Sequence, residues 1–176
     1  MPFVELTPPE SAPAELKVIY DDMQRAMGLV PQFFQVMGRK PDLIRAMQGV
    51  GGSIMGDGAL PKAVKEQMAV VVSGINTSSY CVALHLEMLR GLGIEKNLGR
   101  KLATNYPAAQ VEEKVKVLFR LADQLTKNPE SFGEADVDEV LKAGWSREAV
   151  LEAVLAASLF NFYNRISIGL GLVPDF

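Results

Sequence analysis

Cysteine and histidine are almost absent from this chain of 176 residues, which has one of each. A single cysteine excludes an intrachain disulfide framework and is typical of a reducing compartment, so we expect a cytoplasmic protein. Lysine and arginine total 18 against 21 acidic residues, and they form no basic stripe interleaved with aromatic residues. We therefore expect no nucleic-acid partner.

Long hydrophobic runs are also missing. The longest apolar stretches, residues 68–75 and 153–162, fall far below the roughly 20 residues that a membrane-spanning helix needs. The first residues, MPFVELTPPESAPAEL, contain neither a basic segment nor an apolar core, so they do not resemble a signal peptide. We expect no membrane partner.

No convincing alternating strand pattern occurs, and the periodicity is helical almost throughout. The sequence predicts an all-α protein of about eight helices. Its length suits a single domain covering residues 1–176. Residues 1–13, which contain four prolines, are predicted to form an extended arm, and residues 61–90 a helix hairpin.

Proline, glycine and capping residues mark the helices of this hairpin. Pro61 is predicted to open the first helix, which breaks near Gly74, a poor helix former. Asn76 or Thr77 is expected to cap the second helix, which starts near Ser78. The eight methionines and the phenylalanines near Phe160 and Phe162 are interpreted mainly as core or subunit interface, with a substrate-pocket role as the lesser alternative.

The cysteine and the histidine lie four residues apart, in the segment INTSSYCVALH. On a helix, Ser78, Cys81 and His85 share one face because they are spaced by three and four residues. Cys81 falls near the first turn, where the helix dipole favours an anion, and His85 is placed to take its proton. Glu66, on the preceding helix, is placed to orient His85 if the hairpin closes.

An ordinary structural interpretation of these residues stands beside the chemical one. A free cysteine in an apolar stretch is typically a small buried side chain, and a lone histidine is more often a satisfied core residue than a base. Glu66 is also spaced to pair with Lys62 on a helix surface. Spacing alone leaves both interpretations open.

The run EQMAVVVSGINTSSYCVALH resembles the core motif of the alkylhydroperoxidase D / carboxymuconolactone decarboxylase superfamily. That motif has a glutamate, then a Cys-x-x-Cys pair, then a histidine, and Glu66, Ser78, Cys81 and His85 occupy its positions. The segments GLVPQFFQVMGRKPDLIRAM and LKAGWSREAVLEAVLAASLFNFYNRISIGLGL are similar to flanking segments of the peroxidase-related branch. The resemblance therefore covers most of the chain.

This resemblance implies an AhpD-like helical fold, a homo-oligomer (dimer, trimer or hexamer) and peroxide reduction without a cofactor or metal. It makes Cys81 the peroxide-reacting thiol, with His85 and Glu66 as its proton relay. Ser78 departs from the pattern, because it replaces the cysteine that would close an internal disulfide. We therefore expect an alkylhydroperoxidase-like oxidoreductase, an antioxidant with peroxiredoxin-type activity, that uses one thiol and an external thiol reductant.

Two other hypotheses accommodate the loss of one cysteine. The lactone decarboxylase branch does without a cysteine pair, so His85 and Glu66 would perform acid/base chemistry on a small organic acid. A buried Arg165 would then hold the carboxylate of that acid, although a structural ion pair is an equal role for it. The third hypothesis is a non-catalytic oligomeric subunit that keeps only the fold.

Overall fold

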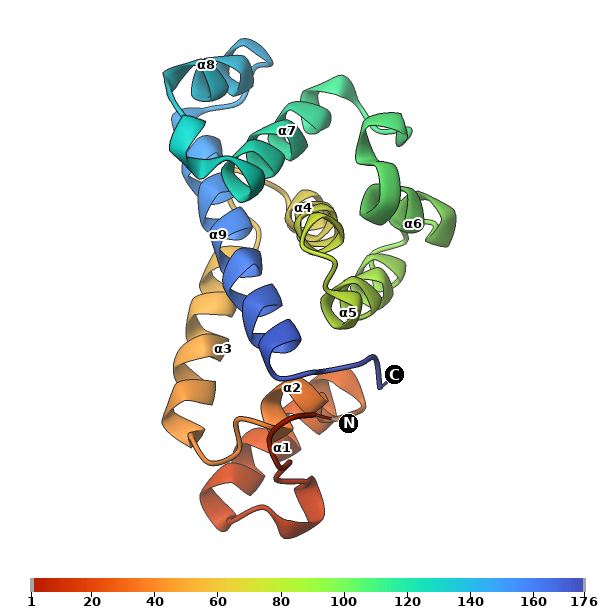
Figure 1. The fold of residues 1–176 in the computed structure, drawn as a ribbon, viewed down its shortest axis with the longest axis vertical. Coiled ribbons are helices and arrows are strands. Elements are labelled where there is room, and N and C mark those ends of the chain that lie inside the picture. The colour runs from red at the N-terminus through yellow and green to blue at the C-terminus, as the bar shows by residue number, and fades with distance from the viewer. Residues whose placement is uncertain (1, 176) are drawn as a thin grey trace.

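Every regular element between residues 2 and 175, the part of the chain that the computed structural model describes, is helical (Figure 1). Met1 and Phe176, the ends of the predicted domain, lie outside the described residues. The α-helices are α1 (Ala14–Met27), α2 (Gln32–Gln35), α3 (Pro41–Met55), α4 (Lys62–Ile75), α5 (Ser79–Gly91), α6 (Lys96–Asn105), α7 (Glu113–Lys127), α8 (Glu134–Lys142) and α9 (Arg147–Gly169). Short 3₁₀ helices occur at Pro9–Ser11, Tyr106–Ala108 and Pro129–Ser131. The predicted all-α class is confirmed, with nine α-helices in the described range.

Helix α4 lies at the centre of the fold. Figure 1 looks nearly along its axis, and α5, α6, α7 and α9 pack around it. All residues from 64 to 73 are buried, including four polar ones: Lys65, Glu66, Gln67 and Ser73. A helix surrounded in this way has to be apolar on nearly every face. This environment explains why a run as rich in valine as residues 68–75 is helical.

The turn after α4 corrects one expectation from the sequence. Asn76 is the C-cap of α4, and Thr77 adopts a left-handed conformation with φ of 58°. Neither residue caps α5, whose N-cap residue is Ser78. The Ser78 N–H donates to Ser73 O at 2.9 Å and the Thr77 N–H to Gly74 O at 3.0 Å, which is the Schellman pattern of helix termination. The geometry of the α4 terminus therefore overrides the preference of Asn76 and Thr77 for the N-cap.

Two hydrophobic clusters make up the interior. The larger surrounds α4 and includes the buried faces of α7 and α9. The second gathers α1, α2 and α3 around Tyr80 and Cys81 of α5, together with Leu172. Tyr163 packs against both clusters, so α5 and the end of α9 lie where the clusters meet.

The N-terminal arm returns to its own chain. The Phe3 N–H donates to Leu170 O and the Thr7 N–H to Gln35 O, both at 2.9 Å. The arm is extended except for the 3₁₀ helix at residues 9–11. Both ends of the described chain therefore lie near α2, as Figure 1 shows. Within residues 2–175, no helix combines the length and apolar character that crossing a membrane requires.

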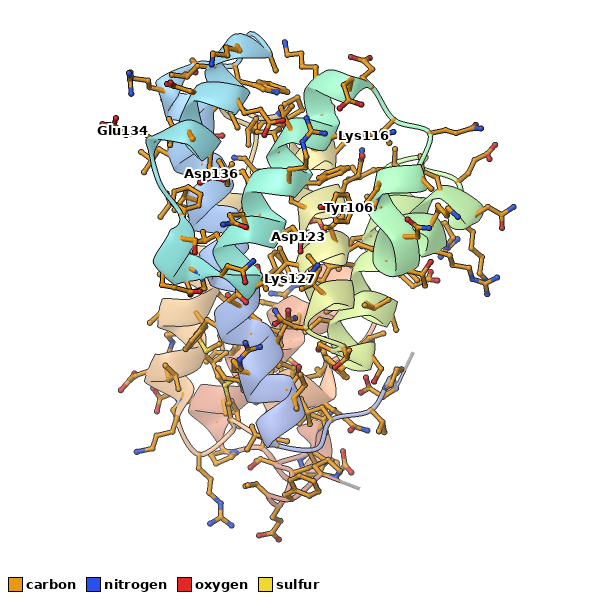
Figure 2. The ribbon with its side chains drawn as sticks, turned by 45° about the horizontal axis from the view of Figure 1, so that its top comes forward. Tyr106, Lys116, Asp123, Lys127, Glu134 and Asp136 are labelled. Atoms are coloured by element: carbon orange, nitrogen blue, oxygen red, sulfur yellow. The ribbon has the colours of Figure 1, made fainter. Side chains whose placement is uncertain are left out.

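Polar side chains tie α7 to the segment before it (Figure 2). The Tyr106 hydroxyl donates to Asp123 Oδ2 at 2.8 Å, and Lys127 Nζ lies 2.6 Å from Asp123 Oδ1. Burial, together with the hydrogen bond to Asp123, raises the pKa of Tyr106. Lys116 Nζ donates to Pro107 O at 3.2 Å. These contacts fix the turn between α6 and α7, and none of these residues lines the cavity described below.

The buried charge of Lys65 is matched by Glu152 of α9. Lys65 Nζ lies 2.9 Å from Glu152 Oε2 and donates to Gly56 O at 2.7 Å. The carboxylate also accepts the N–H groups of Ala59 and Leu60, at 3.0 and 2.8 Å. Burial acts to raise the pKa of Glu152, but the hydrogen bonds from Lys65, Leu60 and Ala59 outweigh it and lower that pKa. One carboxylate thus joins α4, α9 and the loop between α3 and α4.

Replacing this carboxylate is predicted to destabilise the fold at neutral pH. Glu152→Gln should lower the free energy of unfolding by about 3–5 kcal/mol, because it leaves the buried Lys65 charge uncompensated. The folded-state pKa of Glu152 lies below its ordinary value of 4.5, so its contribution is present above that value and is lost as pH falls through the lowered pKa. Denaturant unfolding at pH 7 and at successively lower pH should show the difference between the two proteins shrinking in acid.

Glu139→Gln is the matched control for this prediction. Glu139 pairs with Arg120 on the surface, where an ion pair contributes at most about 1 kcal/mol. An equal loss of stability in the two variants at pH 7 would contradict the role given to Glu152.

Candidate active site

The hairpin of α4 and α5 brings together the two ionisable side chains that the sequence singled out. Glu66 Oε2 lies 2.6 Å from His85 Nδ1, and both side chains are largely buried. The alternative pairing of Glu66 with Lys62 is wrong in this structure, because the carboxylate faces α5 rather than the surface. The tight turn at Thr77 produces this approach, since it reverses the chain and lays α5 along α4.

This contact determines what the imidazole is able to do. A carboxylate at Nδ1 favours the tautomer with its proton on that nitrogen and leaves Nε2 free to exchange a proton. The ring is further held by the edge of Phe160, whose centroid lies 4.6 Å away with the two planes perpendicular. His85 is therefore oriented from two sides, by a charge on α4 and by an aromatic ring on α9.

Cys81 lies on the same helix as His85, in the first turn of α5, and only 4% of its surface is exposed. Its Sγ atom is 3.5 Å from the hydroxyl of Ser167, on α9. Ser78 is also buried, and its hydroxyl is 2.8 Å from that of Ser167. The hydroxyl of Ser167 thus connects the two residues that stand where the family motif has its cysteine pair.

Ser167 was not identified from the sequence. It lies 86 residues from Cys81, and no local spacing connects the two positions. The available signal was a small polar residue on the buried side of an apolar helix, which is compatible with many structural roles. Only the packing of α9 against α5 gives this serine its position.

A cavity of about 570 Å³ opens beside these residues. Glu66, Cys81 and His85 form part of its wall, and the rest is mainly apolar. Five of the eight methionines of the chain contribute to it: Met23, Met27, Met47, Met55 and Met88. Aromatic rings complete it, from Phe33, Phe34, Phe160, Tyr80 and Tyr163. The interpretation of the methionines and Phe160 mainly as core or interface is therefore incomplete, since α1, α3, α5 and α9 aim some of these side chains into the cavity.

Tyr80 closes the cavity on the side of the second cluster. Its hydroxyl accepts the Phe33 N–H at 3.2 Å, and Asp175 is a further neighbour. Burial raises the pKa of Tyr80 strongly, so the phenol stays protonated at physiological pH. Its ring stacks against Phe33, with centroids 6.5 Å apart. Tyr80 therefore supports the wall of the cavity and does not act as a base.

Arg165 does not occupy the position expected for a carboxylate-binding residue. The sequence predicted a buried guanidinium, whereas Arg165 is exposed and donates to Asn76 Oδ1 at 2.7 Å. It lies outside the cavity wall, because its side of α9 faces solvent while Asn164 and Ser167 face inward. Among residues 2–175, no group of three or more His, Cys, Asp and Glu side chains is arranged to hold a metal ion.

Comparison with known proteins relates this arrangement to others. Residues 41–97 match the model of the carboxymuconolactone decarboxylase family, and no curated protein matches the chain. An uncharacterized peroxidase-related protein from Ralstonia eutropha JMP134, with an alkylhydroperoxidase AhpD core, superimposes with a TM-score of 0.91 at 23% identity, over 99% of this chain and 92% of that one. A peroxidase-related protein from Silicibacter sp. TM1040 gives 0.88 at 25% identity, over 93% and 86%.

A third similar structure is that of a debrominase. The debrominase Bmp8 superimposes with a TM-score of 0.82 at 20% identity, over 98% of this chain and 92% of that one. A Bmp8 variant with one cysteine replaced by alanine has been solved with 2,3,4-tribromopyrrole. The shared fold therefore does not by itself determine the reaction of this chain. The family match over residues 41–97 and the fold shared with the peroxidase-related proteins agree: the chain has the AhpD-like helical fold, and both findings support its resemblance to the alkylhydroperoxidase D / carboxymuconolactone decarboxylase superfamily.

Proposed function

We propose that the protein is an alkylhydroperoxidase-like enzyme that reduces organic hydroperoxides through the single thiol of Cys81. The observation that carries this proposal is the 2.6 Å contact between Glu66 and His85 at the wall of the cavity that Cys81 also lines. A buried carboxylate–imidazole pair beside a thiol is the arrangement that activates a cysteine nucleophile.

The proposed reaction has two stages. His85 takes the proton of Cys81, and the thiolate attacks the terminal oxygen of the hydroperoxide, so that an S–O bond forms as the O–O bond breaks. The departing alkoxide takes the proton from His85, which leaves an alcohol and a sulfenic acid. One external thiol then forms a mixed disulfide with Cys81 and releases water, and a second external thiol restores the cysteine.

The walls of the cavity support an organic substrate rather than hydrogen peroxide. Apolar ligand sites gain affinity by burying hydrocarbon and need few polar groups to fix orientation. Here the reactive residues occupy one part of a wall that methionine and aromatic side chains otherwise dominate. Methionine adapts its shape readily, which favours a range of apolar substituents over one rigid ligand.

The acid/base alternative, acting on a small lactone acid, has less support. Its carboxylate-binding residue, Arg165, is exposed and lies outside the cavity wall. The same cavity would receive such a substrate, so the shape of the site does not distinguish the two functions. The requirement for the Cys81 thiol does. Peroxide reduction requires Cys81, whereas decarboxylation or isomerisation requires only His85 and Glu66.

Loss of the thiol is predicted to abolish peroxide reduction. Cys81→Ser should remove the activity, and His85→Gln and Glu66→Gln should lower kcat/KM by about 10²–10⁴, the range for loss of general acid/base catalysis. The measurements are consumption of cumene hydroperoxide with a small-molecule thiol, and trapping of the sulfenic acid for mass spectrometry.

Glu87→Gln serves as the control, because Glu87 lies on α5 but pairs with Arg90 at the surface. This variant should keep full activity. A folded wild-type protein whose Cys81 stays unmodified by hydroperoxide would overturn the proposal. Retention of a lactone-acid activity in Cys81→Ser, with its loss in His85→Gln, would favour the alternative.

Restoring the missing cysteine is predicted to change how the oxidised thiol is resolved. Ser78→Cys should form an internal disulfide after one equivalent of hydroperoxide, because the N-cap position 78 and position 81 recreate the Cys-x-x-Cys spacing and both side chains contact the Ser167 hydroxyl. At excess hydroperoxide, this variant should accumulate less sulfinic acid than the wild type. Intact-mass measurement with thiol counting detects both products.

Ser79→Cys is the matched control, since Ser79 is exposed and points to another face of the helix. It should not close a disulfide with Cys81 in the monomer. Equal over-oxidation in wild type and Ser78→Cys would show that position 78 does not control resolution.

A further inference from the structure

The hydroxyl of Ser167 has one hydrogen to donate but three polar groups within hydrogen-bond distance. It lies 3.0 Å from Asn164 O, 2.8 Å from Ser78 Oγ and 3.5 Å from Cys81 Sγ. A carbonyl oxygen only accepts, so the single hydrogen of Ser167 is directed at Asn164 O while Cys81 is protonated. In that state Ser167 Oγ accepts from the Ser78 hydroxyl and from the Cys81 thiol. All three buried groups are satisfied around a neutral cysteine.

Ionisation of Cys81 removes one of these donors. A thiolate only accepts hydrogen bonds. Cys81 is 4% exposed, so water does not solvate its sulfur well, and an anion there without a hydrogen-bond donor is unfavourable. Rotation of the Ser167 hydroxyl turns its hydrogen from Asn164 O to Sγ and supplies that donor without moving the backbone. The Ser78 hydroxyl goes on donating to Ser167 Oγ, which polarises the Ser167 O–H and strengthens its bond to sulfur.

We propose that Ser167 is a positioning residue that stabilises the Cys81 thiolate through its hydroxyl, and that Ser78 acts on the thiolate through Ser167. The inference deepens the proposed function, because it concerns the same thiol. It also gives a chemical role to the serine that replaces the first cysteine. A thiol at position 78 would be a weaker donor to Ser167 than a hydroxyl is.

A purely structural role of the two serines, in packing alone, is the alternative to stabilisation of the thiolate. The pH dependence of Cys81 reactivity distinguishes the two roles. The other titratable groups at the cavity are Lys62, Glu66, Tyr80, His85 and Tyr163, with Asp175 next to Tyr80. Ser→Ala substitutions change none of them. A change in the pH profile therefore reports on the hydroxyl groups, whereas a structural role would change stability without shifting the profile.

The test measures the rate of Cys81 alkylation by iodoacetamide as a function of pH. Ser167→Ala should raise the pH of half-maximal rate by about one unit, equivalent to a roughly tenfold slower reaction below that pH. Ser78→Ala should produce a smaller shift of the same sign. The double variant should match Ser167→Ala, because Ser78 acts through Ser167, and Ser167→Thr should restore the wild-type profile by keeping the hydroxyl.

Ser73→Ala is the control for loss of a buried hydroxyl. Ser73 is fully buried and accepts a hydrogen bond from Asn164 Nδ2 at 2.9 Å, without contact to Cys81. Its profile should match the wild type. An unshifted profile in Ser167→Ala, or equal shifts in Ser167→Ala and Ser73→Ala, would overturn the inference. Because alkylation needs no peroxide, this outcome is distinct from failure of the proposed peroxidase activity.

Discussion

Burial of helix α4 on all sides is the constraint on which the rest of the structure depends. A polar side chain in such a helix needs a partner within the protein, because water does not reach it. The partners of the two buried charged side chains are supplied from other helices: Glu152 of α9 for Lys65, and His85 of α5 for Glu66. The neighbours of α4 are therefore placed by charge and hydrogen bonding as well as by apolar packing.

The two carboxylates around α4 show how similar surroundings serve different purposes. Glu152 faces a lysine and two backbone N–H groups, an arrangement that keeps it ionised and links three parts of the fold. Glu66 faces an imidazole whose second nitrogen remains available beside a cavity. In the first arrangement, the carboxylate of Glu152 is hydrogen-bonded entirely within the protein. In the second, Nε2 of His85 remains without a partner in the pair and is able to exchange a proton. This available nitrogen distinguishes the candidate catalytic pair from the structural ion pair.

Local signals in the sequence predicted much of the fold, because they act over a few residues. Pro61 directly precedes α4, and this helix ends one residue after Gly74, as the chemistry of proline and glycine predicts. The contact between Glu66 and His85 was also predictable from the sequence, since two helices joined by a tight turn pack against each other in few ways. The cap predicted at Asn76 or Thr77 was wrong, because the end of α4 uses both residues. The positions of the Ser167 and Arg165 side chains depend on the rotation of α9 about its own axis, which the local sequence does not determine.

The thiol belongs to the cluster formed by α1, α2 and α3, whereas Glu66 and Phe160 belong with the helices around α4. The cavity takes its walls from both groups. An apolar molecule bound there would touch both and add to the contact between them. Occupancy of the site and attachment of the N-terminal helices are therefore thermodynamically linked: a ligand that fills the cavity stabilises the attached state by an amount set by its own concentration and affinity.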